Sequence, residues 1–225
     1  MPDVSGRVAI IIRHAERDPI DIMTRALEAR LTPGGKSDAF QLGQSLARYN
    51  PISIYYSPVP RCMQTAECIY EGVASRNAQA TLAGHLLELG GPYITSTWDE
   101  VVNAIEQFGH SVFIRKWFNN ELPSNLIMPL PEAADIQLSI LAGQLRSSAS
   151  SSINITHDWN IMILREYYFN LRHEDIGDPD YLDGMCAYLH HDGMHLRYHG
   201  HERIIGFSAA GADAHWPLPQ SETFD

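Results

Sequence analysis

Cysteine is scarce in this chain of 225 residues, which contains only Cys62, Cys68 and Cys186. Cys62 and Cys68 lie six residues apart on a predicted helix, so their side chains point to different faces and are poorly placed to pair. We therefore expect no disulfide framework, and a reducing compartment is the simplest interpretation.

Long apolar runs are also missing from the sequence. No run approaches the ~18 apolar residues that a membrane-spanning helix requires. The opening residues MPDVSGR contain no basic segment that leads into an apolar stretch of signal-peptide length. We therefore expect a cytoplasmic protein that does not bind a membrane.

Positive charge is the scarcer sign: 16 Lys and Arg residues stand against 27 Asp and Glu residues, and the formal net charge is −11. Nucleic acids and anionic membranes are bound through basic patches, so this balance argues against both as partners. A few arginines in a cleft can still form a local cationic pocket. The length and the hydrophobic content of 44% are typical of a globular protein, so we expect residues 1–225 to form one domain with at most a small insert.

One stretch, residues 8–19 with the sequence VAIIIRHAERDP, joins an apolar run to cationic side chains. The run has no polar alternation, which is typical of a strand buried on both faces of a parallel sheet. Arg13 and His14 follow directly, and Arg17 comes shortly after. Because open α/β sheets bind ligands at the carboxyl ends of their strands, these residues suggest an anion site that contains an imidazole. An ordinary solvated loop is the alternative for this stretch taken alone.

Two further motifs follow apolar runs in the same way. The sequence SPVPRCMQTAE follows the run 52–56 and places Arg61 in the first turn of a predicted helix. His157 and Asp158 follow the run 152–156 at the start of another predicted helix. A helix N-terminus carries free N–H groups and partial positive charge, which favour an anion.

Together the three strand-end motifs, in this chain order, resemble the histidine phosphatase superfamily, which contains the phosphoglycerate mutases and the histidine acid phosphatases. The resemblance covers residues 8–67 and 153–165 and includes the helix entry LTPGG. It implies an α/β fold of the phosphoglycerate mutase-like type. We expect a three-layer α/β/α sandwich whose sheet is mostly parallel, with one antiparallel edge strand and a small inserted cap.

The resemblance also implies a reaction. His14 would attack the phosphorus of a phosphate monoester as a neutral imidazole and form a phosphohistidine. Arg13, Arg17 and Arg61 would hold the non-bridging oxygens, because the forked guanidinium matches phosphate. His157 would add a further N–H donor. These groups supply the chemistry themselves, so we expect no metal and no other cofactor.

The proton donor for the leaving group is open between two carboxyl groups. Asp158 matches the acid phosphatase branch of the superfamily, in which an aspartate follows the histidine, and Arg17 with Pro19 fits that branch as well. Glu88, in the sequence LLELG, is the counterpart in the mutase branch. We favour Asp158, and either carboxyl group would need a raised pKa to be protonated near neutral pH. Glu16 is interpreted as orienting an arginine or contacting substrate, with a solvated loop charge as the alternative.

Residues 74–131 show weaker periodicity and match no motif. Helices are predicted over 97–108 and 110–119, separated by Gly109, and prolines interrupt the sequence that follows. We interpret the region as an insert that lies over the strand ends and caps the substrate. Ordinary packing helices without substrate contact are the alternative.

Histidines gather near the C-terminus around a predicted hairpin, in which strands over 187–190 and 194–198 flank the turn HDG. His191, His195 and His199 would share one face of a strand, which makes a metal site conceivable. However, positions four apart along a strand are separated by about 13 Å, too far for three ligands of one ion. We therefore expect surface or hydrogen-bonding histidines and no bound metal.

The sequence thus predicts a metal-independent phosphatase that hydrolyses a small phosphorylated metabolite through a phosphohistidine on His14. Two alternatives stay open: a phosphomutase that uses the same intermediate, and a catalytically silent module that binds a phosphoester for regulation. Transfer between positions of a labelled substrate, as opposed to release of free phosphate, would identify the mutase. Tight ligand binding without turnover would identify the silent module.

Overall fold

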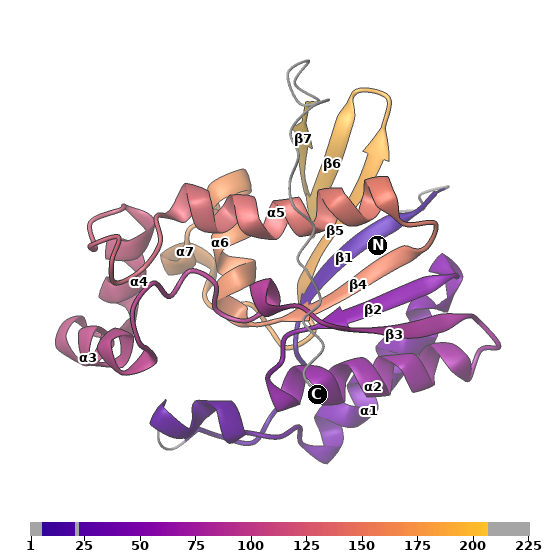
Figure 1. The fold of residues 1–225 in the computed structure, drawn as a ribbon, viewed down its shortest axis with the longest axis horizontal. Coiled ribbons are helices and arrows are strands. Elements are labelled where there is room, and N and C mark those ends of the chain that lie inside the picture. Colours follow the sequence, from indigo (N-terminus) through magenta and orange to yellow (C-terminus); the bar gives the residue numbers. More distant parts are fainter. Residues whose placement is uncertain (1–5, 21–22, 207–225) are drawn as a thin grey trace, which may run out of the picture.

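The computed structural model describes residues 6–20 and 23–206, which form one mixed β-sheet with helices on both faces (Figure 1). The sheet has seven strands in the order β3-β2-β4-β1-β5-β6-β7. Their bounds are β1 Val8–Arg13, β2 Ile52–Tyr56, β3 Ala80–His85, β4 Ser151–Thr156, β5 Gly184–His190, β6 Gly193–Tyr198 and β7 His201–Ile205. The helices are α1 Pro33–Leu46, α2 Pro60–Ala74, α3 Trp98–Phe108, α4 His110–Phe118, α5 Leu130–Ser147, α6 Asp158–Phe169 and α7 His173–Ile176. Short 3-10 segments are η1 Met23–Glu28, η2 Ala47–Tyr49 and η3 Leu87–Leu89.

The sheet is half parallel and half antiparallel, so the expected mostly parallel sheet with one antiparallel edge strand is wrong in that detail. Strands β3, β2, β4 and β1 are joined by three parallel pairings. The pairings β1–β5, β5–β6 and β6–β7 are antiparallel. Tight turns join β5 to β6 and β6 to β7 and reverse the chain each time, whereas helices link β1 to β2, β2 to β3 and β3 to β4. Strand β5 follows α6 and α7 and enters the sheet antiparallel to β1.

The predicted first strand, β1, lies in the middle of the sheet and is buried on both faces. Its residues Val8–Ile12 are each at most 2% exposed. Val8, Ile10 and Ile12 pack in a core shared with α1 and α2, whereas the two residues between them pack with α5 and α6. The molecule therefore has the three layers that were expected, with helices on each side of the sheet (Figure 1).

Helices α1 and α2 pack closely on one face of the sheet because each has a glycine at the contact. A Cβ atom on Gly43 of α1 would lie 2.3 Å from the carbonyl oxygen of Ile69. A Cβ atom on Gly72 of α2 would lie 2.1 Å from the carbonyl oxygen of Phe40. Any larger side chain at either position would push the two helices apart.

The middle region of the chain divides between the sheet and a helical cover. Residues 80–85, which the sequence analysis placed in the insert, form the edge strand β3. The two helices predicted on either side of Gly109 are α3 and α4, which lie on the α6 side at one end of the molecule (Figure 1). Their buried side chains, such as Phe113 and Trp117, share a core with Trp159 of α6. Among the described residues, no helix is both long and apolar enough to cross a membrane.

Candidate active site

The carboxyl ends of three neighbouring strands meet at one edge of the sheet. Arg13, the last residue of β1, pairs with Thr156, the last residue of β4. Tyr56, the last residue of β2, pairs with Ile155, which precedes Thr156. The residues that follow these ends are His14, Ser57 and His157, and the three motifs therefore come together in space. The rings of His14 and His157 have centroids 5.6 Å apart.

Arg61 joins the two imidazole rings. It lies in the first turn of α2 and is 8% exposed. Its Nε donates to His14 Nε2 at 3.0 Å, and one terminal nitrogen donates to His157 Nδ1 at 3.1 Å. The other terminal nitrogen donates to the carbonyl oxygen of Ala26 at 2.8 Å. One guanidinium group is thus fixed from three directions, between the two histidines.

The contacts of His14 define its tautomer. Its Nδ1 lies 2.8 Å from the carbonyl oxygen of Ala15, which can only accept, so Nδ1 carries the hydrogen. Its Nε2 accepts from Arg61, which can only donate, so Nε2 presents a lone pair. Burial, and after it the charge of Arg61, lowers the pKa of His14 well below the usual 6.5. The ring is therefore neutral near pH 7, with the lone pair on Nε2 directed at Arg61.

His157 has the opposite tautomer. Its Nδ1 accepts from Arg61, so the hydrogen lies on Nε2, which donates to Ser57 Oγ at 2.9 Å. Burial, and after it Arg61, lowers the pKa of His157 to about 3, so this ring is also neutral. The N–H group that the sequence analysis assigned to an incoming phosphate is bonded to Ser57 here.

Arg13 and Asp158 form an ion pair at 2.8 Å next to these rings. The other carboxylate oxygen of Asp158 accepts from the backbone N–H of Trp159 at 2.9 Å. The guanidinium of Arg13 also lies over the ring of Tyr181, 4.4 Å from its centroid, and donates to the carbonyl oxygen of Pro179. The Nε of Arg13 is buried without a hydrogen-bond partner among the described residues. Arg13 therefore keeps one donor unused beside the site.

Two helices begin at this edge and add partial positive charge to it. Val59 precedes the 15 residues of α2, and His157 precedes the 12 residues of α6. Neither residue caps its helix through its side chain, and both line the cavity described next. The backbone itself therefore favours an anion here, as expected from the sequence for helices that start at strand ends.

A cavity of about 360 Å³ opens over the strand ends. Its polar end is formed by His14, Arg17, Arg61, His157 and Asp158. The remaining lining is largely apolar and comes from η1, α3, the start of α6 and the loops after β1, β2 and η3, together with His110 of α4. The side chains from these segments include Ile20, Leu27, Ile94, Trp98, Ile105 and Trp159. Helix α3 thus contributes Trp98 and Ile105 to the lining of the cavity.

Three of the predicted site residues do not line this cavity: Arg13, which adjoins it through its ion pair with Asp158, and the two glutamates. Glu16 is exposed, and its Oε2 accepts from the hydroxyl of Thr32, the N-cap residue of α1, at 2.6 Å. Glu88 lies in η3, where its backbone carbonyl oxygen accepts from Gln137 at 2.7 Å. Neither side chain lines the cavity, whereas Asp158 does. Of the two candidate proton donors, only Asp158 is therefore in place.

The sequence analysis assigned no role to two residues of the site, Ser57 and Tyr181. Ser57 was part of a quoted motif without a role, although its position directly after a strand is the signal that identified His14. Tyr181 lies 5.8 Å from His14 between ring centroids and comes from a loop before β5 that has no motif. Cys62 lies beside the site, but burial raises the pKa of its thiol to about 12, so it remains protonated and is not a nucleophile.

Residues 9–111 match the family model of the histidine phosphatase superfamily, branch 1. This range contains β1, α1, β2, α2, β3 and α3, and with them His14 and Arg61. The resemblance stated from the motifs is thereby confirmed for this part of the chain. A search of curated protein sequences finds no match.

Solved structures share the fold across most of the chain. The structure of mycobacterial glucosyl-3-phosphoglycerate phosphatase with inorganic phosphate is 13% identical with a TM-score of 0.59, and the match covers 90% of this chain and 98% of that one. The phosphoglycerate mutase from Bacillus anthracis is 13% identical with a TM-score of 0.53, and the match covers 89% of this chain and 93% of that one. At such identities the likeness establishes the fold, which is α/β and phosphoglycerate mutase-like.

Proposed function

We propose that this chain is a phosphoric monoester hydrolase that passes the phosphoryl group through His14. The observation that carries the proposal is the hydrogen bond from Arg61 Nε to His14 Nε2. It requires a lone pair on Nε2, and it holds a guanidinium beside that lone pair, where the phosphoryl oxygens of a substrate would lie. A nucleophile and an oxygen-binding group are thereby supplied together.

In the first step, His14 Nε2 forms a bond to phosphorus while the bond from phosphorus to the leaving oxygen breaks. The leaving oxygen takes a proton from Asp158. In the second step, water attacks phosphorus, gives a proton back to Asp158 and releases inorganic phosphate, and the electron pair returns to Nε2. The hydrogen stays on Nδ1 throughout and keeps its hydrogen bond to the carbonyl oxygen of Ala15, so the ring keeps one tautomer.

Binding of phosphate would rearrange two arginines: Arg61, which now donates to His14, and Arg13, which is now paired with Asp158. The Nε–H group of Arg61 would exchange its hydrogen bond to His14 for one to a phosphoryl oxygen, which frees the Nε2 lone pair of His14 for attack. Arg13 would turn toward the phosphate with its unpartnered Nε and leave Asp158. Asp158, released from Arg13, would then be free to face the leaving oxygen of the substrate.

The cavity lining indicates the class of substrate. Beyond its polar end the cavity is largely apolar, and its Lys and Arg residues within the described chain are Arg17 and Arg61. A mutase must also hold the second charged group of its substrate, which would call for more cations than these. We therefore infer a hydrolase for a small ester whose leaving group is apolar or aromatic.

The test is release of phosphate from 4-nitrophenyl phosphate by the wild type and by His14→Ala, each with EDTA present. We expect turnover by the wild type, its loss in His14→Ala, and normal turnover by His201→Ala, which removes an exposed histidine on β7. Acid quenching should trap an acid-labile phosphoenzyme in the wild type only. Turnover that persists in His14→Ala would overturn the mechanism, and transfer without net phosphate release would indicate the mutase.

A further inference from the structure

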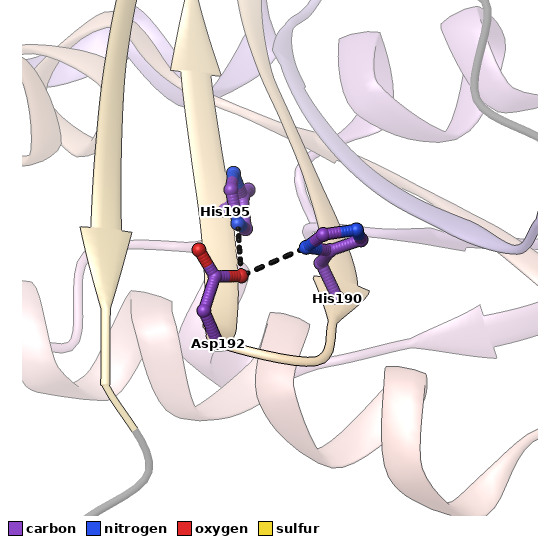
Figure 2. Close-up of side chains that lie close together, drawn as sticks. All are labelled: His190, Asp192 and His195. Carbon is purple, nitrogen blue, oxygen red and sulfur yellow. Dashed lines mark hydrogen bonds and ion pairs between the residues drawn. The ribbon is translucent and has the colours of Figure 1, made fainter.

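A second cluster of chemically active side chains lies on the hairpin between β5 and β6. His190 ends β5, Asp192 lies in the turn, and His195 lies on β6 (Figure 2). Asp192 Oδ1 is 2.9 Å from His190 Nδ1 and 2.8 Å from His195 Nε2. The three atoms all lie within 4.8 Å of one another. Among the residues the structure describes, this is the one such group of three.

The ring nitrogen of His195 that faces away from Asp192 also has a hydrogen-bond partner. His195 is 8% exposed, and its Nδ1 lies 3.3 Å from Glu202 Oε1 on β7. The same carboxylate oxygen accepts from the hydroxyl of Tyr188 at 2.8 Å, and Arg197 Nε lies 3.4 Å from it. A carboxylate that accepts from the far nitrogen of a histidine is the usual support of a metal-ligating imidazole, because it fixes the direction of the near nitrogen.

We propose that His190 Nδ1, Asp192 Oδ1 and His195 Nε2 bind a divalent transition-metal ion, with Zn²⁺ as the best chemical match. Two imidazoles and one carboxylate suit zinc far better than magnesium or calcium, which prefer oxygen ligands. Metal bonds of about 2.0–2.2 Å separate tetrahedral ligand atoms by about 3.3 Å, so the carboxylate oxygen needs to move away from each histidine nitrogen by only a few tenths of an ångström. The two histidine nitrogens already lie within 4.8 Å of each other, so small side-chain rotations bring them to the same spacing. His190 and Asp192 are exposed, so water can fill the remaining position.

The strand register explains why these three residues meet and where they lie. His190 pairs with Gly193 directly across the turn, and Leu189 pairs with Met194, so His195 falls one step further along the facing strand. Because β5 runs antiparallel to β1, with Tyr188 opposite Val8, the hairpin turn lies at the end of the sheet opposite to His14. The ion would tie the β5–β6 hairpin together and would take no part in the reaction at His14.

The test is a titration of the untagged, chelator-stripped protein with Zn²⁺ in competition with a chromophoric chelator. We expect one equivalent to bind and to raise the midpoint of thermal unfolding. Alanine at His190 or at His195 should weaken binding by about tenfold or more, and Glu202→Gln, which keeps all three ligands, should weaken it by about tenfold as well. His201→Ala is the matched control and should bind like the wild type.

The outcomes separate a metal site from a set of hydrogen bonds. His190 is exposed, so its alanine variant should fold even if the His195 variant does not. Absence of Zn²⁺ binding by the wild type, or binding by the His190 variant with the affinity of the wild type, would overturn the proposal and leave a hydrogen-bonded turn. Phosphate release by the His190 variant should equal that of the wild type, so this test is independent of the proposed reaction at His14.

Discussion

The protonation state of His14 decides the pH range in which the proposed reaction can start. Burial, and then Arg61, lowers the pKa of His14 well below 6.5, so the ring stays neutral and nucleophilic as the pH falls below that value. We expect kcat/KM to show no acid limb from this group near pH 6.5. The measurement is a pH profile with two aryl phosphates whose own phosphate pKa values differ. A limb fixed near pH 6.5 for both substrates would contradict the buried neutral ring, whereas a limb that moves belongs to the substrate.

Asp158 should matter most for substrates whose leaving group needs a proton. We expect Asp158→Asn to lower kcat for an alkyl phosphate by about 10²–10⁴-fold, and to lower it far less for 4-nitrophenyl phosphate, whose leaving group departs without a proton. Glu88→Gln is the matched control, because Glu88 does not line the cavity. Steady-state kinetics on both esters gives the comparison. A leaving-group-dependent loss in Glu88→Gln would move the acid to that residue.

Residues that directly follow a buried strand could be predicted from the sequence, because a parallel sheet brings such ends together. His14, Arg61, His157 and Asp158 meet for this reason. Tyr181 and Pro179 could not be predicted, because their contacts with Arg13 depend on the path of an irregular loop. The sequence also gave no sign that Arg61 would bond to both histidines, since that contact depends on its side-chain conformation.

The contact between α1 and α2 depends on glycine at Gly72. In Gly72→Ala the new Cβ would overlap the carbonyl oxygen of Phe40, so the helices must separate or bend. We expect a loss of about 1–3 kcal/mol in the free energy of unfolding, measured by urea denaturation. Gly143→Ala in α5 is the matched control: nothing lies within 4 Å of its Cβ, so alanine should stabilise the helix by about 0.5–1 kcal/mol. Equal effects of the two substitutions would contradict the close packing.

Helices and strands with a strong local sequence pattern were predicted well, but the way the strands pair in the sheet was not. The turn HDG correctly predicted the β5–β6 hairpin. Strand β7 has mostly exposed residues and no apolar alternation, so no sequence pattern predicted that it would pair with β6. The histidines show the same limit. The sequence analysis compared His191, His195 and His199 along a single strand, whereas the group that meets crosses the turn and includes Asp192. Only the register of the hairpin shows this.

The charge of the whole chain limits its partners but does not describe its cavity. A net charge of −11 coexists with Arg17 and Arg61 at the polar end of the cavity, next to two helix N-termini. Cations gathered in a concave site attract a small anion even when the overall surface is acidic. The apolar part of the lining comes from segments that are far apart in the sequence, and so the substrate class could not be predicted before the fold was known.

The two buried neutral histidines should make the stability of the whole molecule depend on pH. The pKa of His14 and of His157 is lower in the folded chain than the 6.5 of an exposed histidine, for His157 about 3. Between those values the unfolded chain binds more protons, so stability is full above pH 6.5 and falls as the pH is lowered. The expected slope is about 1.4 kcal/mol per pH unit for each histidine.

Urea denaturation at several values between about pH 7 and pH 4.5 measures this slope. His157→Gln lowers stability at every pH, but it also removes one titrating group, so its slope should be smaller by about 1.4 kcal/mol per pH unit. His201→Gln removes an exposed histidine and should keep the slope of the wild type. Because carboxylates titrate alike in all three proteins, the difference between slopes isolates His157. If the wild type and His157→Gln gave equal slopes, His157 would have to be charged in the folded protein, and it could not then accept the hydrogen bond from Arg61.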